Sequence, residues 1–241
     1  MAESVADAVI VGAGASGGVM AKELAEAGLR VVVLERGPAI NPEDQVLHDE
    51  LTSQVSGYVR SSVWGEQKFG VREFRYTEGE PFQVVNPGDW EFSTSAAGVG
   101  GAQLPFGALM WRRPPIDFRM RTEYGSVDGS ALEDWPLTYD DLEPFYTKAE
   151  YELGVSGEGG VNPFEGKRSK PYPLPPISLH PGDEIIREVA RRKGYHPFIV
   201  PLGLLTEPYK GRSSCIAHPC CNGFICEIGA KSTPVSALFP A

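Results

Sequence analysis

A glycine-rich turn near the start of the chain constrains the fold more than any other feature. Residues 11–17 read Val-Gly-Ala-Gly-Ala-Ser-Gly, the pattern G-x-G-x-x-G, between an apolar run at 6–11 and a helical pattern at 16–27. A second apolar run at 29–35 follows the helical pattern. This order predicts two buried parallel strands joined by a right-handed helical crossover, and hence an α/β fold.

The turn predicts a dinucleotide-binding site, because a pyrophosphate is held well by main-chain N–H groups at a helix N-terminus. In this pattern the first glycine makes the turn, the second admits the phosphates and the third lets the helix pack on the strand. A carboxylate at the end of the second strand would accept hydrogen bonds from the adenosine ribose. The residues assigned to the site are Gly12, Ala13, Gly14, Ala15, Ser16, Gly17, Glu35 and Arg36. The alternative is a glycine-rich turn that holds no ligand.

A second glycine-rich segment, at residues 96–108, bears on which dinucleotide is bound. FAD is long enough to need a further main-chain surface beside its flavin ring, whereas a nicotinamide dehydrogenase has no obvious use for one. The N-terminal position of the turn and the sequence Leu-Glu-Arg-Gly at 34–37 also favour a flavoprotein. An NAD-dependent Rossmann dehydrogenase remains the alternative.

Composition and charge argue against several other classes of protein. The chain has 28 glycines and 21 prolines among 241 residues, too many for a helix bundle or a coiled coil. Its formal net charge of −10, with no basic face, argues against nucleic acid and anionic membranes as partners. The longest strongly apolar stretch, residues 31–34, is far shorter than the ~20 residues that span a bilayer. The acidic N-terminus leads directly into a strand, so we expect no signal peptide and a cytoplasmic location, with periplasmic export beside a signal-bearing partner as the alternative.

The rest of the chain predicts fewer regular elements. Residues 38–95 have no sustained period and suggest a long surface excursion, and the proline-rich segment at 157–181 suggests an extended connector. A helix is predicted from Thr138, as its cap, to Leu153, with Pro144 expected to kink or split it. A short amphipathic helix is predicted at 183–193.

At several points the chain resembles the glucose-methanol-choline (GMC) oxidoreductases, flavoenzymes that oxidise alcohols and sugars. The resemblance is carried by the first turn with Glu35, by Gly-Val-Gly-Gly-Ala-Gln-Leu-Pro-Phe-Gly at 98–107, and by Trp111 and Arg112. Residues 134–146 and 153–157 look most like the large subunits of bacterial gluconate, sorbitol and FAD-dependent glucose dehydrogenases. The resemblance covers essentially the whole chain and corresponds to the N-terminal half of such an enzyme.

The resemblance implies a fold and a division of the chain. The fold would be a Rossmann-like FAD/NAD(P)-binding domain, a parallel sheet with helices on both faces, with part of an interleaved α+β substrate domain. Residues 1–241 would form an incomplete FAD-binding oxidoreductase. Its expected parts are a β-α-β dinucleotide-binding unit at 1–37, a flavin-binding and lid segment at 38–130, a partial substrate domain at 131–210, and a cysteine segment at 211–241 that returns to the FAD domain.

The resemblance also implies contacts with the flavin. Main chain would line the ring along 100–102, and the full set of residues assigned to it is Gly100, Gly101, Ala102, Phe106 and Gly107. Many family members have asparagine, and some a covalently attached histidine, near the place of Pro105 and Phe106. Because this chain has neither residue there, we expect FAD to be held without a covalent bond.

The implied reaction is hydride transfer from the CH–OH group of an alcohol or sugar to the flavin. In this family a C-terminal histidine, with a second histidine or an asparagine beside it, takes the hydroxyl proton, so we expect the catalytic residues beyond Ala241 and an inactive fragment. None of the histidines present matches that context; they are His48, His180, His196 and His218. The implied partners are a small subunit and a cytochrome c electron acceptor.

All four cysteines fall within twelve residues, as Cys215, Cys220, Cys221 and Cys226. They could bind an iron–sulfur cluster through three thiolates, as some relatives in the resembling branch do, or a zinc ion, or they could be structural or redox-labile thiols. The cluster would also fit a different function, an electron-transfer subunit built on these cysteines. A truncated, inactive chain is a further alternative.

Overall fold

The computed structural model describes residues 5–39, 72–74, 79, 83–85, 98–104, 106–217 and 225–240. The chain divides into two units. Unit 1 contains Met1–Gly107, His218–Glu227 and Thr233–Ala241, and unit 2 contains Ala108–Ala217 and Ile228–Ser232. The boundaries expected from the sequence, at 37, 130 and 210, remain predictions.

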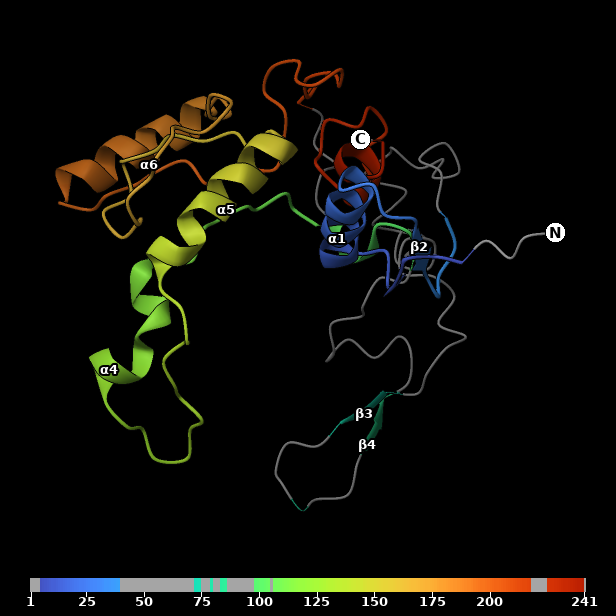
Figure 1. The fold of residues 1–241 in the computed structure, drawn as a ribbon. Coiled ribbons are helices and arrows are strands. Elements are labelled where there is room, and N and C mark those ends of the chain that lie inside the picture. Colours follow the sequence, from blue (N-terminus) through green and yellow to red (C-terminus); the bar gives the residue numbers. More distant parts are fainter. Residues whose placement is uncertain are drawn as a thin grey trace. The chain divides into compact units, whose positions relative to one another are not determined.

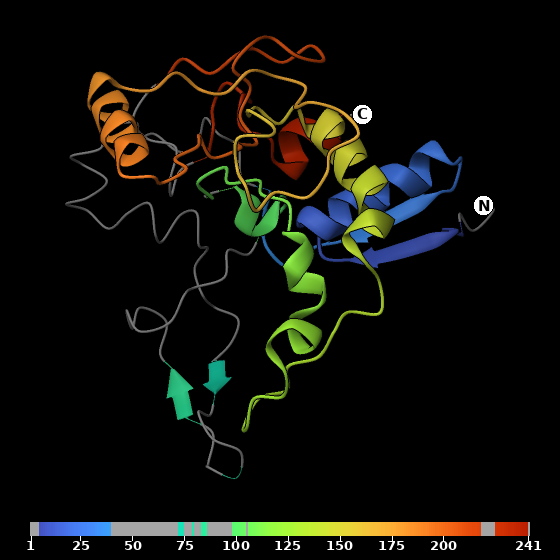
Figure 2. The ribbon, with the colours of Figure 1, turned by 90° about the vertical axis from the view of Figure 1, so that its left-hand side faces the viewer.

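Unit 1 begins with the predicted β-α-β arrangement. Strand β1 (Ala8–Val11) leads through the turn into helix α1 (Ala15–Glu26), and strand β2 (Val31–Leu34) returns beside β1 (Figure 1). The strands are parallel, with Cα partners running from Ala8↔Val31 to Val11↔Leu34. Figure 2 shows α1 alongside this strand pair. The Rossmann-like fold class predicted from the sequence is therefore confirmed.

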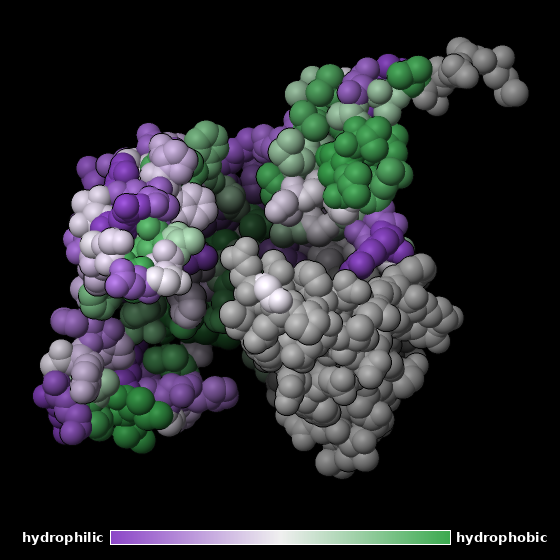
Figure 3. Space-filling model, turned by 90° about the horizontal axis from the view of Figure 1, so that it is seen from below, coloured by the Kyte–Doolittle hydropathy of each residue, from purple (hydrophilic) through white to green (hydrophobic). Residues whose placement is uncertain are grey.

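The prediction that both strands are buried is wrong for the chain as described. Alternate side chains of each strand are exposed, with exposed fractions of 58% for Val9, 86% for Val11, 44% for Val32 and 53% for Leu34. Figure 3 shows apolar surface in this part of the molecule. A strand is buried on both sides only where layers cover both faces of its sheet, and among the described residues this sheet has two strands packed by α1.

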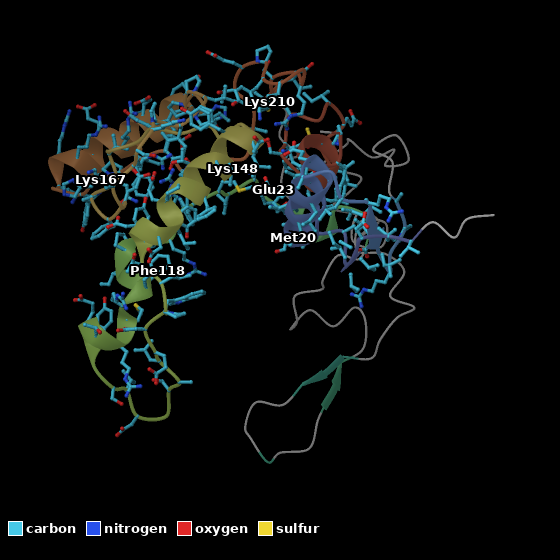
Figure 4. All side chains as sticks on the ribbon, in the orientation of Figure 1. Met20, Glu23, Phe118, Lys148, Lys167 and Lys210 are labelled. Atoms are coloured by element: carbon cyan, nitrogen blue, oxygen red, sulfur yellow. The ribbon has the colours of Figure 1, made fainter. Side chains whose placement is uncertain are left out.

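Helix α1 buries two small residues and a lysine rather than its larger apolar residues. Its buried residues are Gly18, Ala21 and Lys22, whereas Val19 and Met20 are 44% and 51% exposed; Figure 4 labels Met20 on this helix. A Cβ atom on Gly18 would lie 3.1 Å from side-chain carbons of Leu238 and of Pro234. The absence of a side chain at Gly18 thus lets the C-terminal π-helical turn η4 (Pro234–Leu238) approach α1 closely.

The remaining described parts of unit 1 are short. Strands β3 (Arg72–Phe74) and β4 (Gln83–Val85) pair antiparallel, and the 3-10 helix η2 spans Gly101–Gln103. Apart from β3, β4 and Gly79, residues 40–97 lie outside the described residues, and so does most of the predicted surface excursion.

Unit 2 contains the 3-10 helix η3 (Pro115–Phe118) and the helices α4 (Met120–Tyr124), α5 (Tyr139–Leu153) and α6 (Pro181–Arg192). A capping box starts α5, since the Thr138 hydroxyl accepts a bond from the Asp141 N–H and the Asp141 carboxylate accepts one from the Thr138 N–H. The predicted split at Pro144 does not occur, because α5 runs as one helix from Tyr139 to Leu153 through this proline, and the alternative of a kink there stays a prediction. Helix α6 starts two residues earlier than predicted.

The core of unit 2 is built from single β-bridges instead of a sheet. Ser156 pairs with Leu174 and with Leu202, and Leu204 pairs with Lys231. Val155, Leu205 and Ala230 are at most 1% exposed. The predicted connector at 157–181 is irregular up to the start of α6, apart from the bridge at Leu174. Among the described residues, no helix is both long and apolar enough to cross a membrane.

Candidate dinucleotide site

The turn between β1 and α1 depends on two of its three glycines for its shape. Gly12 has φ +99°, a conformation that side chains disfavour, and its N–H donates to the Leu34 carbonyl oxygen at 2.7 Å. A Cβ on Gly17 would lie 1.9 Å from the carbonyl oxygen of Gly12, so helix and turn can approach only because Gly17 has no side chain. Around Gly14, by contrast, no atom of the described residues lies within 4 Å of an added Cβ. The second glycine of the pattern therefore faces open space.

The start of α1 leaves hydrogen-bond donors available. Gly14 is its N-cap, no side chain of the described residues caps it, and its first turn holds no acidic residue. The first N–H groups of a helix have no partner inside the helix, and at this end the helix dipole favours negative charge. Unlike α5, whose first turn contains Asp140 and Asp141, α1 is therefore electrostatically open to an anion.

Glu35 joins the end of β2 to the turn. Its carboxylate accepts hydrogen bonds from the N–H of Ala13 at 2.8 Å and of Gly37 at 2.9 Å. Partial burial would raise the pKa of Glu35, but these bonds, with that of the Arg36 N–H and the nearby Arg36 charge, bring the pKa below its ordinary value. The ionised carboxylate can accept further hydrogen bonds, which suits it to a ribose hydroxyl group.

The second glycine-rich segment lies directly against the first turn. The N–H of Gly100 donates to the Ala13 carbonyl oxygen at 2.8 Å. A Cβ on Gly101 would lie 3.0 Å from the Cα of Gly14. Gly100 and Gly101 have φ +105° and +59°, and Val99 donates to the Pro38 carbonyl oxygen at 3.0 Å. Two glycine-rich segments far apart in the sequence thus form one continuous main-chain surface.

Most of the predicted site residues meet at this surface. The contacts above join seven of them, Gly12, Ala13, Gly14, Gly17, Glu35, Gly100 and Gly101, and Ala15 and Ser16 begin α1 directly after the turn. Ala102 is exposed within η2, Arg36 is exposed, and Phe106 and Gly107 are half-buried just after η2. Sequence reasoning missed Leu104, which is 2% exposed and whose Cδ2 would lie 2.6 Å from a Cβ on Gly100. The one sequence feature that could have indicated Leu104 is its position as an apolar residue three places after Gly101.

Arg112, part of the sequence resemblance, has a structural place inside unit 2. Its guanidinium binds both carboxylate oxygens of Glu150, at 2.8 and 2.7 Å, and also contacts Glu143 and the Tyr139 hydroxyl. Burial would lower the pKa of Arg112, but these partners raise it above its ordinary value. With its side chain 3% exposed, Arg112 is a permanently charged anchor of α5.

The structure describes only some of the predicted cysteines and histidines. Cys215 belongs to unit 2 and is half-buried, its N–H donating to the Leu205 carbonyl oxygen at 2.8 Å, and Cys226 belongs to unit 1. Cys220 and Cys221, together with His48 and His218, lie outside the described residues. Within the described ranges, no group of three or more His, Cys, Asp or Glu side chains could hold a metal ion. The iron–sulfur hypothesis has no support and remains a prediction.

His180 and His196 lie in unit 2. His180 is the N-cap of α6, where its N–H donates to the Asp183 carboxylate at 3.3 Å, and His196 is exposed. These observations give His180 a structural place and assign neither histidine a catalytic one.

The fold and the site define a Rossmann-like dinucleotide-binding unit. A family model described as an NAD(P)-binding Rossmann-like domain matches residues 10–41. The chain is 28% identical to the gluconate 2-dehydrogenase flavoprotein of Pantoea cypripedii and 29% identical to the fructose dehydrogenase large subunit of Gluconobacter japonicus. It is 30% identical to the paromamine 6'-oxidase of Streptomyces fradiae. Each of these comparisons covers 98% of this chain.

The chain is similar over almost its whole length to GMC-type oxidoreductases, as its sequence motifs implied. It spans about two-fifths of the length of these relatives, covering 42%, 43% and 38% of them respectively.

Proposed function

We propose that this chain binds FAD without a covalent bond and supplies the cofactor-binding part of an oxidoreductase that acts on CH–OH groups of alcohols or sugars. The pyrophosphate would bind at the N-terminus of α1, the adenosine ribose at Glu35, and the flavin beside residues 98–104. The observation that carries the proposal is the direct contact between the two glycine-rich segments, through the Gly100 N–H and the Ala13 carbonyl oxygen at 2.8 Å.

The residues present fit FAD in three respects. The open space at Gly14 allows phosphate oxygens to approach the main chain. Among the described residues, no side chain bonds the first N–H groups of α1, and its first turn holds no competing carboxylate. The segment with the buried Gly100 and the half-buried Gly101 lies against the turn, and its main chain beside Gly101 would support the flat ring. When bound, FAD supplies a hydride acceptor for oxidation of a CH–OH carbon.

The choice of FAD over NAD rests on this second surface. A nicotinamide dinucleotide needs the turn and the acidic residue, both of which are present, but it leaves the segment at 98–104 without a role. One of the similar proteins is itself named a flavoprotein. An NAD-dependent dehydrogenase is therefore the second candidate function.

The substrate class and the partners follow from the relatives rather than from the site. Relatives are named for gluconate, for fructose and for paromamine, so we propose an alcohol or sugar as substrate. The proton-accepting base would belong to the part of such proteins that this chain does not span. Because one relative is named a large subunit, a small subunit is a proposed partner, and the cytochrome c acceptor is proposed from the sequence resemblance alone. Cytoplasmic and periplasmic locations both remain predictions.

The proposal is tested by titrating the purified chain with FAD and, separately, with NAD. We expect saturable quenching of flavin fluorescence by one equivalent of chain, with release of flavin on denaturation because no covalent bond holds it. A folded chain that binds NAD and not FAD would replace this proposal with the nicotinamide enzyme. Iron and acid-labile sulfide analysis of the same sample tests the cysteine prediction separately.

A further inference from the structure

The C-terminal turn η4 contacts both α1 and the second glycine-rich segment of unit 1. Figure 1 shows η4 beside α1, where Pro234 and Leu238 pack at Gly18. On its other side, Cγ2 of Val235 would lie 3.1 Å from a Cβ on Gly100. This turn therefore connects the helix that begins at the first glycine-rich turn with the segment proposed to lie beside the flavin.

Local contacts hold η4 in one place. The Thr233 hydroxyl accepts a bond from the Ser236 N–H at 3.2 Å, and the Ser236 hydroxyl accepts one from the Thr233 N–H at 3.0 Å. Thr233, Pro234 and Leu238 are each at most 4% exposed, whereas Val235 is 37% exposed. Because its neighbours anchor the turn, the half-buried Val235 has a fixed position without being part of the deep core.

The glycine-rich segment beside Val235 depends on outside contacts for its order. Gly100 and Gly101 have φ +105° and +59°, and glycine loses more conformational freedom on folding than any other residue. The N–H of Gly100 donates to the Ala13 carbonyl oxygen at 2.8 Å. On the face where a side chain would stand, Gly100 meets Val235 and Leu104. The segment is thus held between the first turn on one side and two apolar side chains on another.

These two side chains differ in the elements to which they belong. Leu104 is part of the glycine-rich segment, and its N–H donates to the Gly101 carbonyl oxygen at 3.1 Å, so Leu104 moves with the segment. Val235 belongs to η4, which packs on α1. Val235 therefore links the segment to the helix whose N-terminus is proposed to bind the pyrophosphate.

We propose, building on the function proposed above, that Val235 is a positioning residue that holds the main chain at Gly100 and Gly101 in the form that receives the flavin. A binding surface that is ordered in advance loses less conformational entropy when its ligand arrives, so loosening the surface weakens binding. The adenosine and the pyrophosphate would lie at Glu35 and the first turn. Binding of that half of the cofactor should therefore not depend on Val235.

Amide hydrogen exchange of the 241-residue chain without cofactor tests the positioning itself. Val235→Ala removes both methyl groups of the side chain, one of which faces Gly100. We expect the Gly100 amide to exchange at least about threefold faster in V235A, because local opening controls exchange. Val235→Thr keeps a Cγ2 methyl group and should exchange as the parent does. Val189→Ala, at a valine of α6 that is 44% exposed, is the matched control and should also behave as the parent.

Two results of this measurement would overturn the proposal. One is an unchanged exchange rate of the Gly100 amide in V235A. The other is an equal acceleration of the amides of β1 and β2, which would show that Val235 stabilises unit 1 in general.

Calorimetric titration of the same variants with FAD and with ADP connects Val235 to the cofactor. We expect V235A to bind FAD at least about threefold more weakly and ADP as the parent does, and V235T to match the parent for both. Equal losses for FAD and ADP, or no loss for FAD when the parent binds it, would contradict the role of Val235. A parent chain that binds no FAD would instead refute the proposed function, and hydrogen exchange would still decide whether Val235 positions the segment.

Discussion

Single residues of the first turn have separable roles, since Gly17 shapes the turn and Gly14 faces open space. A Cβ added at Gly14 would touch no atom of the described residues within 4 Å but would enter the volume proposed for the pyrophosphate. We predict that Gly14→Ala lowers FAD affinity at least about tenfold, which corresponds to about 1.4 kcal/mol. The matched control is Gly182→Ala in α6, where an added Cβ also meets nothing, and it should leave FAD affinity unchanged. Equal FAD affinities of G14A and the parent chain would show that the pyrophosphate does not bind beside Gly14.

Gly17→Ala should act on the fold itself. The added Cβ would lie 1.9 Å from the Gly12 carbonyl oxygen, so the turn or the helix must shift. We predict a loss of about 1–3 kcal/mol in the free energy of unfolding, measured by urea denaturation without cofactor. Gly14→Ala should lose no more than about 1 kcal/mol in the same measurement, as expected for a change at an N-cap. A reversed order of the two variants would contradict the assigned roles.

The residues of this turn were predictable because their pattern is local. Gly12, Gly17 and Glu35 follow from the spacing within one β-α-β unit. The contact of Gly100 with Ala13 could only be expected as a consequence of cofactor length, since no local pattern links segments so far apart. Leu104 was not predicted, because its importance arises from burial under Gly100, which depends on tertiary packing.

At the scale of elements, α5 is fixed to unit 2 by Arg112. The guanidinium is nearly fully buried and bound by Glu150, Glu143, Thr147 and Tyr139. Without the Arg112 guanidinium, the buried Glu150 carboxylate loses one of its two cationic partners among the described residues and keeps Arg168. We predict that Arg112→Met costs about 3–5 kcal/mol of unfolding free energy.

The neighbouring Arg113 provides the control for this prediction. Its side chain is 73% exposed and pairs with Asp117, four residues on, at 3.3 Å. Arg113→Met should cost less than about 1 kcal/mol by the same urea denaturation. A small, equal loss for both variants would mean that the buried network does not anchor α5.

Helix boundaries were predicted better than helix environments. Capping at Thr138 and the stop signals Gly28 and Gly194 are local, and they placed α1, α5 and α6 within two residues. The exposure of Val19 and Met20 could not be read from periodicity, because it depends on what covers each face of α1. The same reason explains the wrong prediction of buried strands.

At the scale of the molecule, acid stability should depend on the carboxylates of unit 2. Bonds from the Ser169 N–H, and then from Thr147, Arg112 and the Ser169 hydroxyl, lower the pKa of Glu143 from 4.5 to about 2 against the opposing effect of burial. Because the folded pKa is depressed, this stabilisation is complete above pH 4.5 and is lost as the pH falls through about 2.

Urea denaturation from pH 7 down to the acid limit measures this dependence. We predict that Glu143→Gln is less stable than the parent at neutral pH and that the difference shrinks as the pH falls below about 4.5. Glu158→Gln, which removes an exposed carboxylate outside the network, should follow the parent throughout. A constant difference for E143Q across this range would refute the assignment.

The chain as a whole divides into two units, a division that the sequence indicated only through the resemblance. Residues 218–227 and 233–241 join unit 1, although 108–217 and 228–232 form unit 2. Such interleaving has no local signature, because it depends on which chain segments meet after folding. Residues 40–71 and 86–97, which fall within the predicted flavin-binding and lid segment, lie outside the described residues.

The central claim is that one cofactor lies along both glycine-rich segments of unit 1. The most direct test compares the affinities of FAD and ADP for the 241-residue chain by calorimetric titration, because ADP has the adenosine and pyrophosphate but lacks the flavin. If the flavin rests on Gly100 and Gly101, FAD should bind at least about tenfold more tightly than ADP. Equal affinities for FAD and ADP would contradict the account.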